Sequence, residues 1–166
     1  IYHGIGINKL TYKWLPVFLN LLDLSIVCSD FELLKFKLNR IKESKIVRVH
    51  HGIEHKLYGF ENDEKNYYRE EIRNEIGVLE DDFIIGYIGR LSPEKGCDLI
   101  IPAFKKVIEK NSSVKLVIVG DGILKNAMQE QVENNHLGDK VVFTGFRDDI
   151  PKVLCCLDSL VLPSYM

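Results

Sequence analysis

Two cations and two glycines lie between an apolar run and a helix pattern, in the stretch GYIGRLSPEKG that begins at Gly86. Arg90 carries a planar guanidinium that matches phosphate oxygens, and Lys95 places a mobile point charge five residues later. Two such cations can neutralise a diphosphate whose charge grows as it leaves. These residue types, at this spacing, predict an anion site suited to a nucleoside diphosphate.

The same residues also have a structural interpretation. Glycines often end strands, and Arg90 and Lys95 could be solvated surface charges. For each residue alone, that interpretation is preferred. Because all of them fall at one place between a strand and a helix, where α/β proteins bind anions, we favour a ligand site.

The elements that must position these residues follow from the alternation of the second half of the chain. Short runs rich in Val, Ile and Leu alternate with charged or amphipathic helix patterns. Strands are predicted at 83–89, 114–120, 141–145 and 159–163, and helices at 64–76, 98–110, 124–134 and 150–156. This order predicts an α/β fold with a doubly wound, Rossmann-like parallel sheet covered on both faces.

The ends of the predicted strands carry polar residues and glycines. They read Gly89-Arg90, Gly120-Asp121-Gly122, Gly145-Phe146-Arg147 and Pro163-Ser164. Ligands of open parallel sheets bind outside the carboxyl ends of the strands. Glycine at three of these four ends indicates that something approaches the backbone closely. Asp121 remains open between a ligand contact and a turn or helix-capping residue.

The first 50 residues have a different pattern. An aromatic stretch around Trp14 and Phe18 precedes two short β-type runs, SIVCS and KIVRVH, on either side of a charged helix pattern over 31–45. A polar, turn-rich segment at 59–66 then serves as a linker. The chain begins at Ile1 and stops soon after a predicted strand, so we treat it as a fragment.

The overall composition excludes several classes of protein. A net charge of −2 over 166 residues argues against a nucleic-acid binder, which is normally basic. The four cysteines have no CxxC spacing, which indicates reduced thiols in a cytosolic protein. No apolar run reaches the ~18 residues that a membrane span needs. The cluster of His50, His51 and His55 lacks an HExxH pattern and a cysteine partner, so no metal site is expected.

The ordered set GYIGRLSPEKG, LVIVGDG, VVFTGF and VLPS resembles the nucleotide-binding domain of family 4 glycosyltransferases with the GT-B fold. Upstream, SIVCSD and VRVHHGI resemble that family's last acceptor-domain strand and its crossover into the second domain. The resemblance implies three parts. Residues 1–50 would end the N-terminal acceptor domain, 51–66 would form the crossover, and 67–166 would be a nucleotide-sugar-binding domain that is incomplete at its C-terminus.

The resemblance implies a retaining enzyme that transfers a sugar from a nucleotide diphosphate-sugar to a sugar or lipid-linked acceptor, without a metal or another cofactor. Arg90 and Lys95 would be catalytic, because they would hold the donor diphosphate and stabilise its developing charge. His3 matches a family histidine of the acceptor domain that faces the transferred sugar.

Further donor contacts follow from the same resemblance. Gly89 and Gly120 would bind the donor beside Arg90 and Lys95. Phe146 and Arg147 would line the base pocket, largely through backbone atoms.

The family's paired glutamates, seven residues apart, would begin immediately after Met166, so activity is expected of a full-length parent rather than of the fragment. Two alternatives share the fold: a non-catalytic nucleotide-sugar- or protein-binding module, and a GT-B sugar-nucleotide epimerase.

The expected location is cytoplasmic, with peripheral contact at the cytoplasmic membrane face as an option, because many enzymes that this chain resembles act on lipid-linked acceptors. The lysines of the 31–45 helix pattern would supply the basic face for such contact, but we favour a solvated helix face. The sequence alone predicts neither the donor sugar and base, nor the acceptor, nor the oligomeric state.

Overall fold

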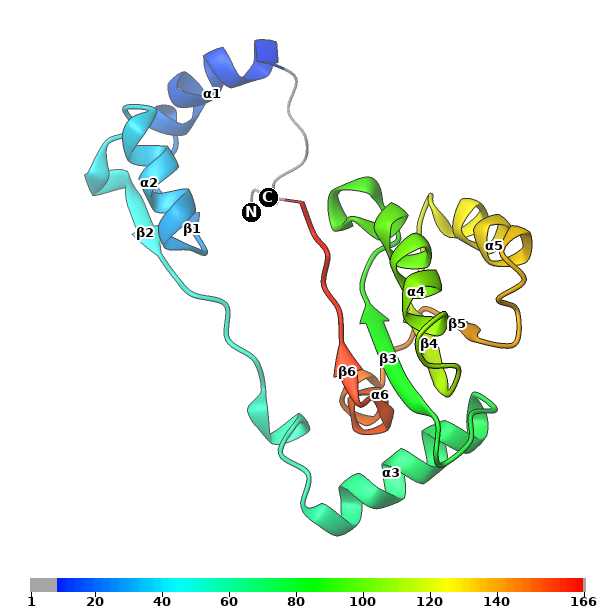
Figure 1. The fold of residues 1–166 in the computed structure, drawn as a ribbon. Helices are drawn as coiled ribbons and strands as arrows, with labels where there is room; N and C mark the ends of the chain where they lie inside the picture. The colour runs from blue at the N-terminus through cyan, green and yellow to red at the C-terminus, as the bar shows by residue number, and fades with distance from the viewer. Residues whose placement is uncertain (1–8, 166) are drawn as a thin grey trace. The chain divides into compact units, whose positions relative to one another are not determined.

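The computed structural model describes residues 9–165 and divides into two compact units, one ending at Glu54 and the other beginning at His55 (Figure 1). The described part of the first unit contains helices α1 (Lys9–Leu21) and α2 (Asp30–Leu38), the short 3-10 helix η1 (Glu43–Lys45), and strands β1 (Ser25–Val27) and β2 (Ile46–Arg48). The two strands pair in parallel. None of the helices in the described part of the chain is long and apolar enough to cross a bilayer.

Helix α2 is shorter than its charge pattern predicts. It begins where the Ser29 hydroxyl accepts the Glu32 N–H at 3.2 Å, and it ends at Leu38. Arg40 adopts a φ of 58°, which a right-handed helix cannot contain. The prediction of one helix over 31–45 is therefore wrong beyond Leu38. Lys45 does not extend the α2 face, because it turns back and donates to the Asn20 and Leu22 carbonyls at 2.7 and 2.8 Å.

The second unit confirms the doubly wound sheet. Its strands are β3 (Phe83–Ile88), β4 (Val114–Val119), β5 (Val141–Gly145) and β6 (Ser159–Leu160), in the all-parallel order β5-β4-β3-β6. The helices are α3 (Asn62–Glu75), α4 (Ile100–Ile108), α5 (Lys125–Asn134) and α6 (Ile150–Cys156). A capping box between Glu61 and Glu64 starts α3, so residues 62–66 are helical. Pro102 falls in the first turn of α4, where a missing N–H removes no helical hydrogen bond.

Both faces of the sheet are buried, because residues of β4 point alternately to two cores. Ile118 packs in a cluster with Phe104 of α4 and Met128 of α5. Val117 packs on the opposite side with residues such as Ile72 of α3 and Val153 of α6. This period of two is what a pleated strand requires, and it explains why the run VKLVIV is almost continuously apolar.

Strand β6 pairs with β3 over only two positions, Ser159 with Ile85 and Leu160 with Gly86. One further backbone hydrogen bond joins the Val161 N–H to the Gly86 carbonyl at 2.9 Å. Pro163 then has no N–H to continue the ladder. The predicted strand over 159–163 was therefore too long.

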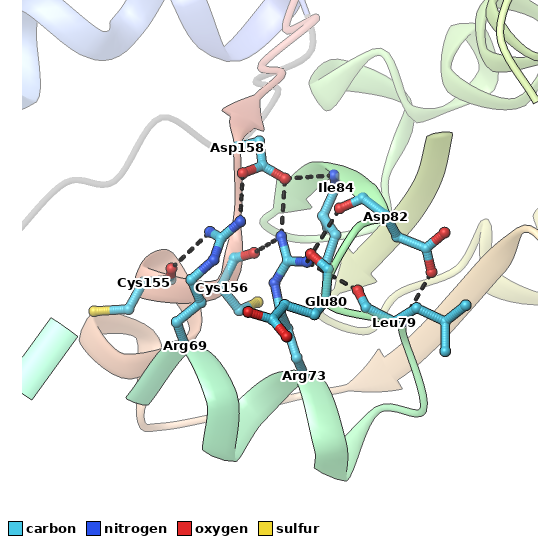
Figure 2. A network of polar contacts seen from close by, with 9 residues as sticks. All are labelled: Arg69, Arg73, Leu79, Glu80, Asp82, Ile84, Cys155, Cys156 and Asp158. Atoms are coloured by element: carbon cyan, nitrogen blue, oxygen red, sulfur yellow. Dashed lines mark hydrogen bonds and ion pairs between the residues drawn. The ribbon is translucent and has the colours of Figure 1, made fainter. Parts of the chain in front are cut away.

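A buried arginine ties α3 to the starts of β3 and β6 (Figure 2). Only 3% of Arg73 is exposed, and its guanidinium pairs with the Asp158 carboxylate at 2.9 Å. The same guanidinium donates to the carbonyls of Leu79, Glu80, Asp82 and Cys156. Asp158 in turn accepts the Ile84 N–H at 2.7 Å. This network stabilises the edge of the sheet opposite the strand ends that carry the candidate site.

Candidate functional site

A cavity of about 350 Å³ lies at the carboxyl ends of β3 and β4. Its lining residues are Ile88, Gly89, Arg90, Val119, Gly120, Asp121, Phe146, Arg147 and Ile150. This volume and this edge of a parallel sheet are typical of a small-ligand site. Lys95 is not among the lining residues. The other predicted site residue, His3, is outside the described part of the chain.

The wall of the cavity is made by two loops that pack backbone against backbone. Gly120 has a φ of +132°, and a β-carbon there would overlap the Gly89 carbonyl. Gly122 meets the Leu91 carbonyl in the same way. The Leu91 N–H also donates to the Asp121 carbonyl at 2.9 Å. The sequence predicted that some group approaches the backbone closely at the strand-end glycines. At Gly120 and Gly122, that group is the backbone of the neighbouring loop.

Arg90 presents its charge to solvent. Its side chain is 76% exposed, and one guanidinium nitrogen lies 3.9 Å from a carboxylate oxygen of Glu94. That oxygen also accepts the Ser92 hydroxyl at 2.7 Å. The Ser92 hydrogen bond, with smaller help from Arg90 and Lys95, lowers the pKa of Glu94. An entering anion therefore reaches an accessible guanidinium with one loosely held carboxylate partner.

Lys95 ends the short 3-10 helix η3 (Pro93–Lys95) and is exposed. Gly96 follows it with a φ of +65°, and a β-carbon on Gly96 would overlap the Pro163 carbonyl. The Tyr165 N–H donates to the Glu94 carbonyl at 3.1 Å. The segment after β6 is therefore packed against the loop that carries Arg90 and Lys95.

The Arg147 side chain is held by two carboxylates. Its guanidinium contacts Glu75 at 2.5 and 3.0 Å and Asp149 at 2.8 and 2.6 Å, and only 13% of the side chain is exposed. Asp149 first and then Glu75 raise the pKa of Arg147, while Arg147 lowers the pKa of both acids. With its charge neutralised in this way, the side chain is a weak anchor for phosphate. Phe146 beside it is 81% exposed and available for contact.

Asp121 acts as a turn residue in this structure. One carboxylate oxygen accepts the Gly122 N–H at 2.7 Å, and the other pairs with Lys125 at 2.8 Å. These bonds, the one to Lys125 first, lower the pKa of Asp121. Of the two interpretations that the sequence left open, the local contacts favour the structural one.

The sequence analysis did not identify two residues, Tyr87 and Glu75, that hold the site residues in place. The Tyr87 hydroxyl donates to the Arg90 carbonyl at 2.8 Å beneath the loop. A tyrosine within an apolar strand is itself a signal, because a buried hydroxyl needs a partner. Glu75 gave no such signal, since it lies 72 residues before Arg147.

Other chemical candidates do not form sites in the described residues. Between residues 9 and 165, no group of three or more His, Cys, Asp or Glu side chains could hold a metal ion. All four cysteines are free. Burial raises the pKa of Cys156 to about 11 and raises that of Cys155 as well, which makes these thiols poor nucleophiles.

Comparison with protein families gives a match over residues 68–166 to the model described as "Glycosyl transferases group 1". A galactosyltransferase of Escherichia coli, named UDP-Gal:alpha-D-GlcNAc-diphosphoundecaprenol alpha-1,3-galactosyltransferase, is 30% identical over 94% of this chain and 41% of its own length. The alpha-monoglucosyldiacylglycerol synthase of Streptococcus pneumoniae is 36% identical over 57% of this chain and 21% of its own length. The chain therefore spans at most about two-fifths of these two relatives.

Solved structures give the same fold. Anabaena Alr3699/HepE in complex with UDP and glucose matches with a TM-score of 0.79 and 22% identity, over 95% of this chain and 42% of that chain. WaaG, a glycosyltransferase involved in lipopolysaccharide biosynthesis, matches with a TM-score of 0.70 and 20% identity, over 85% of this chain and 38% of that chain. These neighbours are GT-B glycosyltransferases, which confirms the predicted fold class.

Proposed function

The chain belongs to the group 1 glycosyltransferase family, and from that premise we propose that its second unit binds the nucleoside diphosphate-sugar donor of a retaining sugar transfer. One observation carries the proposal: the cavity at the strand ends brings together Gly89, Arg90, Gly120, Phe146 and Arg147, from three separate loops. Together, the Arg90 cation, the close backbone at the glycines and the exposed Phe146 ring fit a ligand with a phosphate end and a flat aromatic end.

Arg90 serves as the main phosphate anchor in this proposal. Its exposed guanidinium stands at the cavity wall, whereas the charge of Arg147 is already neutralised by Glu75 and Asp149. Phe146 and Arg147 both line the cavity, and in this proposal Phe146 and the backbone of Arg147 contact the base. Lys95, on the same loop as Arg90, adds its mobile charge when the diphosphate is bound.

The chemistry is a substitution at the anomeric carbon with net retention. The acceptor hydroxyl forms the new bond to that carbon, and the bond from carbon to the diphosphate oxygen breaks. The diphosphate leaves with the electron pair, and the acceptor proton leaves with it or passes to solvent. Arg90 and Lys95 stabilise the charge that grows on the leaving oxygen, so the protein's own cations act where another enzyme would use a metal.

The names of relatives support a uridine donor and a lipid-linked or sugar acceptor. The Escherichia coli relative is named for UDP-Gal and a diphosphoundecaprenol-linked GlcNAc, and HepE was crystallised with UDP-glucose. The pneumococcal relative is named as a synthase of a glucosylated diacylglycerol. Such acceptors fit a cytoplasmic protein that touches the membrane peripherally. His3 keeps its predicted role beside the transferred sugar, and residues 1–50 keep theirs as part of the acceptor domain.

Calorimetric titration of the chain with UDP, GDP and ADP tests donor binding. We expect micromolar to millimolar affinity for UDP, weakened roughly 10- to 10²-fold in an Arg90→Ala, Lys95→Ala double variant, because a hydrogen bond to a charged group contributes about 1.5–3 kcal/mol. Lys106→Ala is the matched control, because Lys106 is exposed on α4 and is not a lining residue of this cavity. Failure of both the chain and a full-length parent to bind any nucleotide contradicts the proposal.

Product analysis with a full-length parent separates the three activities that share this fold. Sugar transfer gives UDP and a glycosylated acceptor, and only when an acceptor is present. An epimerase gives a changed sugar without an acceptor, and a binding module gives no product.

A further inference from the structure

Tyr87 lies buried directly beneath the loop that carries Arg90. Only 1% of the residue is exposed, and its hydroxyl donates to the Arg90 carbonyl at 2.8 Å. The fully buried thiol of Cys97 donates to the Tyr87 oxygen at 3.2 Å. A chain of hydrogen bonds therefore runs from thiol to phenol to backbone and ends at the residue that presents the candidate phosphate anchor.

The peptide group between Arg90 and Leu91 is held from both sides. Its carbonyl accepts from the Tyr87 hydroxyl and from the Ser92 N–H of the same loop, the latter at 3.0 Å, and its N–H donates to the Asp121 carbonyl at 2.9 Å. The tilt of that peptide plane fixes ψ of Arg90, and with it the backbone geometry from which the side chain departs. A β-carbon on Gly89 would lie 3.0 Å from the Tyr87 hydroxyl oxygen, so the phenol fills the space under the loop closely.

Few side-chain contacts fix the direction of the Arg90 side chain. It is largely exposed, and within the described residues its ion pair is with Glu94, at 3.9 Å. A loose surface pair of this kind fixes a side chain poorly. The backbone below Arg90 is therefore the main constraint on where its guanidinium can reach.

We propose that Tyr87 is a positioning residue of the donor site, whose hydroxyl holds the Arg90–Leu91 peptide and so aims Arg90 at the donor diphosphate. Cys97 orients that hydroxyl by donating to it. The inference rests on the proposed function, because it assigns Tyr87 to the same phosphate site. Burial raises the pKa of Tyr87, so the hydroxyl remains a donor throughout the ordinary pH range.

Removal of the hydroxyl takes away the shortest of the hydrogen bonds that the Arg90 carbonyl accepts and leaves the Ser92 N–H, which donates to it at 3.0 Å from within the same loop. The Cys97 thiol lies 3.5 Å from that carbonyl, and a thiol is a weak donor. Without the hydroxyl, the Arg90 carbonyl has no strong donor outside its own loop in the described part of the chain, so the peptide is held less firmly against the strand beneath it. Phenylalanine at position 87 keeps the ring and its packing, so it isolates the contribution of the hydroxyl.

The test is a double-mutant cycle read by titration with UDP. Tyr87→Phe should weaken UDP binding by roughly 5- to 30-fold in the unmodified chain, as expected for a lost buried hydrogen bond. In an Arg90→Ala background it should change affinity by less than about twofold, because its effect passes through Arg90. Tyr67→Phe, which removes an exposed phenol hydroxyl, is the matched control and should bind UDP normally.

A second pair of variants, at Cys97, tests the same hydrogen-bond chain in case the Tyr87→Phe variant does not fold. Cys97→Ala should weaken UDP binding by about two- to threefold, because the Tyr87 hydroxyl loses the donor that orients it. Cys97→Ser keeps a donor and should restore the affinity of the unmodified chain. An equal loss for Ala and Ser, or no loss for either, argues against the role of this hydrogen-bond chain.

Hydrogen exchange gives a readout that needs no nucleotide. In Tyr87→Phe, amides from Leu91 to Gly96 should exchange faster while those of β4 keep their protection. Unchanged loop protection overturns the inference, as does an equal loss of UDP affinity in the two backgrounds, which a merely structural role would produce. If the unmodified chain and its parent bind no nucleotide, the proposed function fails, and the exchange experiment still decides whether Tyr87 positions the loop.

Discussion

The carbonyl oxygen of Gly89 occupies the space into which a β-carbon on Gly120 would project. Two loops from neighbouring parallel strands therefore touch through their backbones at the wall of the candidate site. Gly120 also has a φ of +132°, a conformation that residues with a β-carbon rarely adopt. Steric exclusion and backbone strain act at the same residue.

Replacement of Gly120 by alanine should lower the free energy of unfolding by about 2–4 kcal/mol, because strain and overlap add. Urea unfolding of the chain measures the change.

Two other glycines serve as controls. Gly138 has no atom within 4 Å of an added β-carbon and no left-handed φ, so Gly138→Ala should change the free energy of unfolding by less than about 1 kcal/mol. Gly77→Ala isolates strain, since Gly77 has a φ of +69° and open space around it. Equal stability of the Gly120 and Gly138 variants contradicts the prediction.

The sequence predicted β4 well because the burial of this strand is nearly complete. A run such as VKLVIV can be placed only between two helical layers, so its composition specifies both its structure and its position. The ends of elements were less predictable. The end of α2 depends on one left-handed residue, Arg40, and the length of β6 depends on a partner strand 74 residues earlier in the chain.

Parts of the candidate site that depend on neighbouring residues in the sequence could be predicted. Parts that depend on contacts between residues far apart in the sequence could not. Arg90 follows a strand directly, so its position at the sheet edge follows from the topology. The neutralisation of Arg147 by Glu75 depends on how α3 packs, and nothing near either residue indicates it. Lys95 is likewise not a lining residue of the cavity, and nothing in the sequence near it indicates this.

Replacement of Arg73 by methionine should destabilise the chain by about 3–5 kcal/mol, because it removes the buried cation from the Asp158 carboxylate and leaves several carbonyls without their donor. Burial by itself raises the pKa of Asp158, but the Ile84 N–H and the two arginines outweigh it, and the net pKa is lowered. Urea unfolding at neutral pH measures the effect. Arg69→Met is the comparison: this arginine also pairs with Asp158, but its side chain is 33% exposed, so a smaller loss of about 1 kcal/mol is expected. Similar losses for both variants count against a special role for the buried guanidinium.

The ion pair of Asp149 with Arg147 should make stability depend on acid pH. The bond to Arg147 lowers the pKa of Asp149 in the folded chain below its value near 3.9 in the unfolded chain. The stabilisation is therefore fully present above the unfolded pKa and is lost as pH falls through the folded pKa. Asp149→Asn should cost about 1–2 kcal/mol at pH 7, and the difference from the unmodified chain should shrink below about pH 4. Urea unfolding across that range tests this, with the exposed neighbour Asp148→Asn as control. A gap that stays constant down to pH 2 argues that the carboxylate charge is not responsible.

Glu94 should oppose donor binding, because its carboxylate is the ion-pair partner that a diphosphate must displace from Arg90. Glutamine at this position keeps an oxygen for the Ser92 hydroxyl and removes the charge. We expect Glu94→Gln to bind UDP about two- to fivefold more tightly at low salt, with the gain shrinking as screening increases. Titrations at two salt concentrations measure this, with Glu109→Gln, on an exposed residue at the end of α4, as the control. Weaker binding by Glu94→Gln assigns the opposite role to the carboxylate: it then holds Arg90 in the direction that the diphosphate needs.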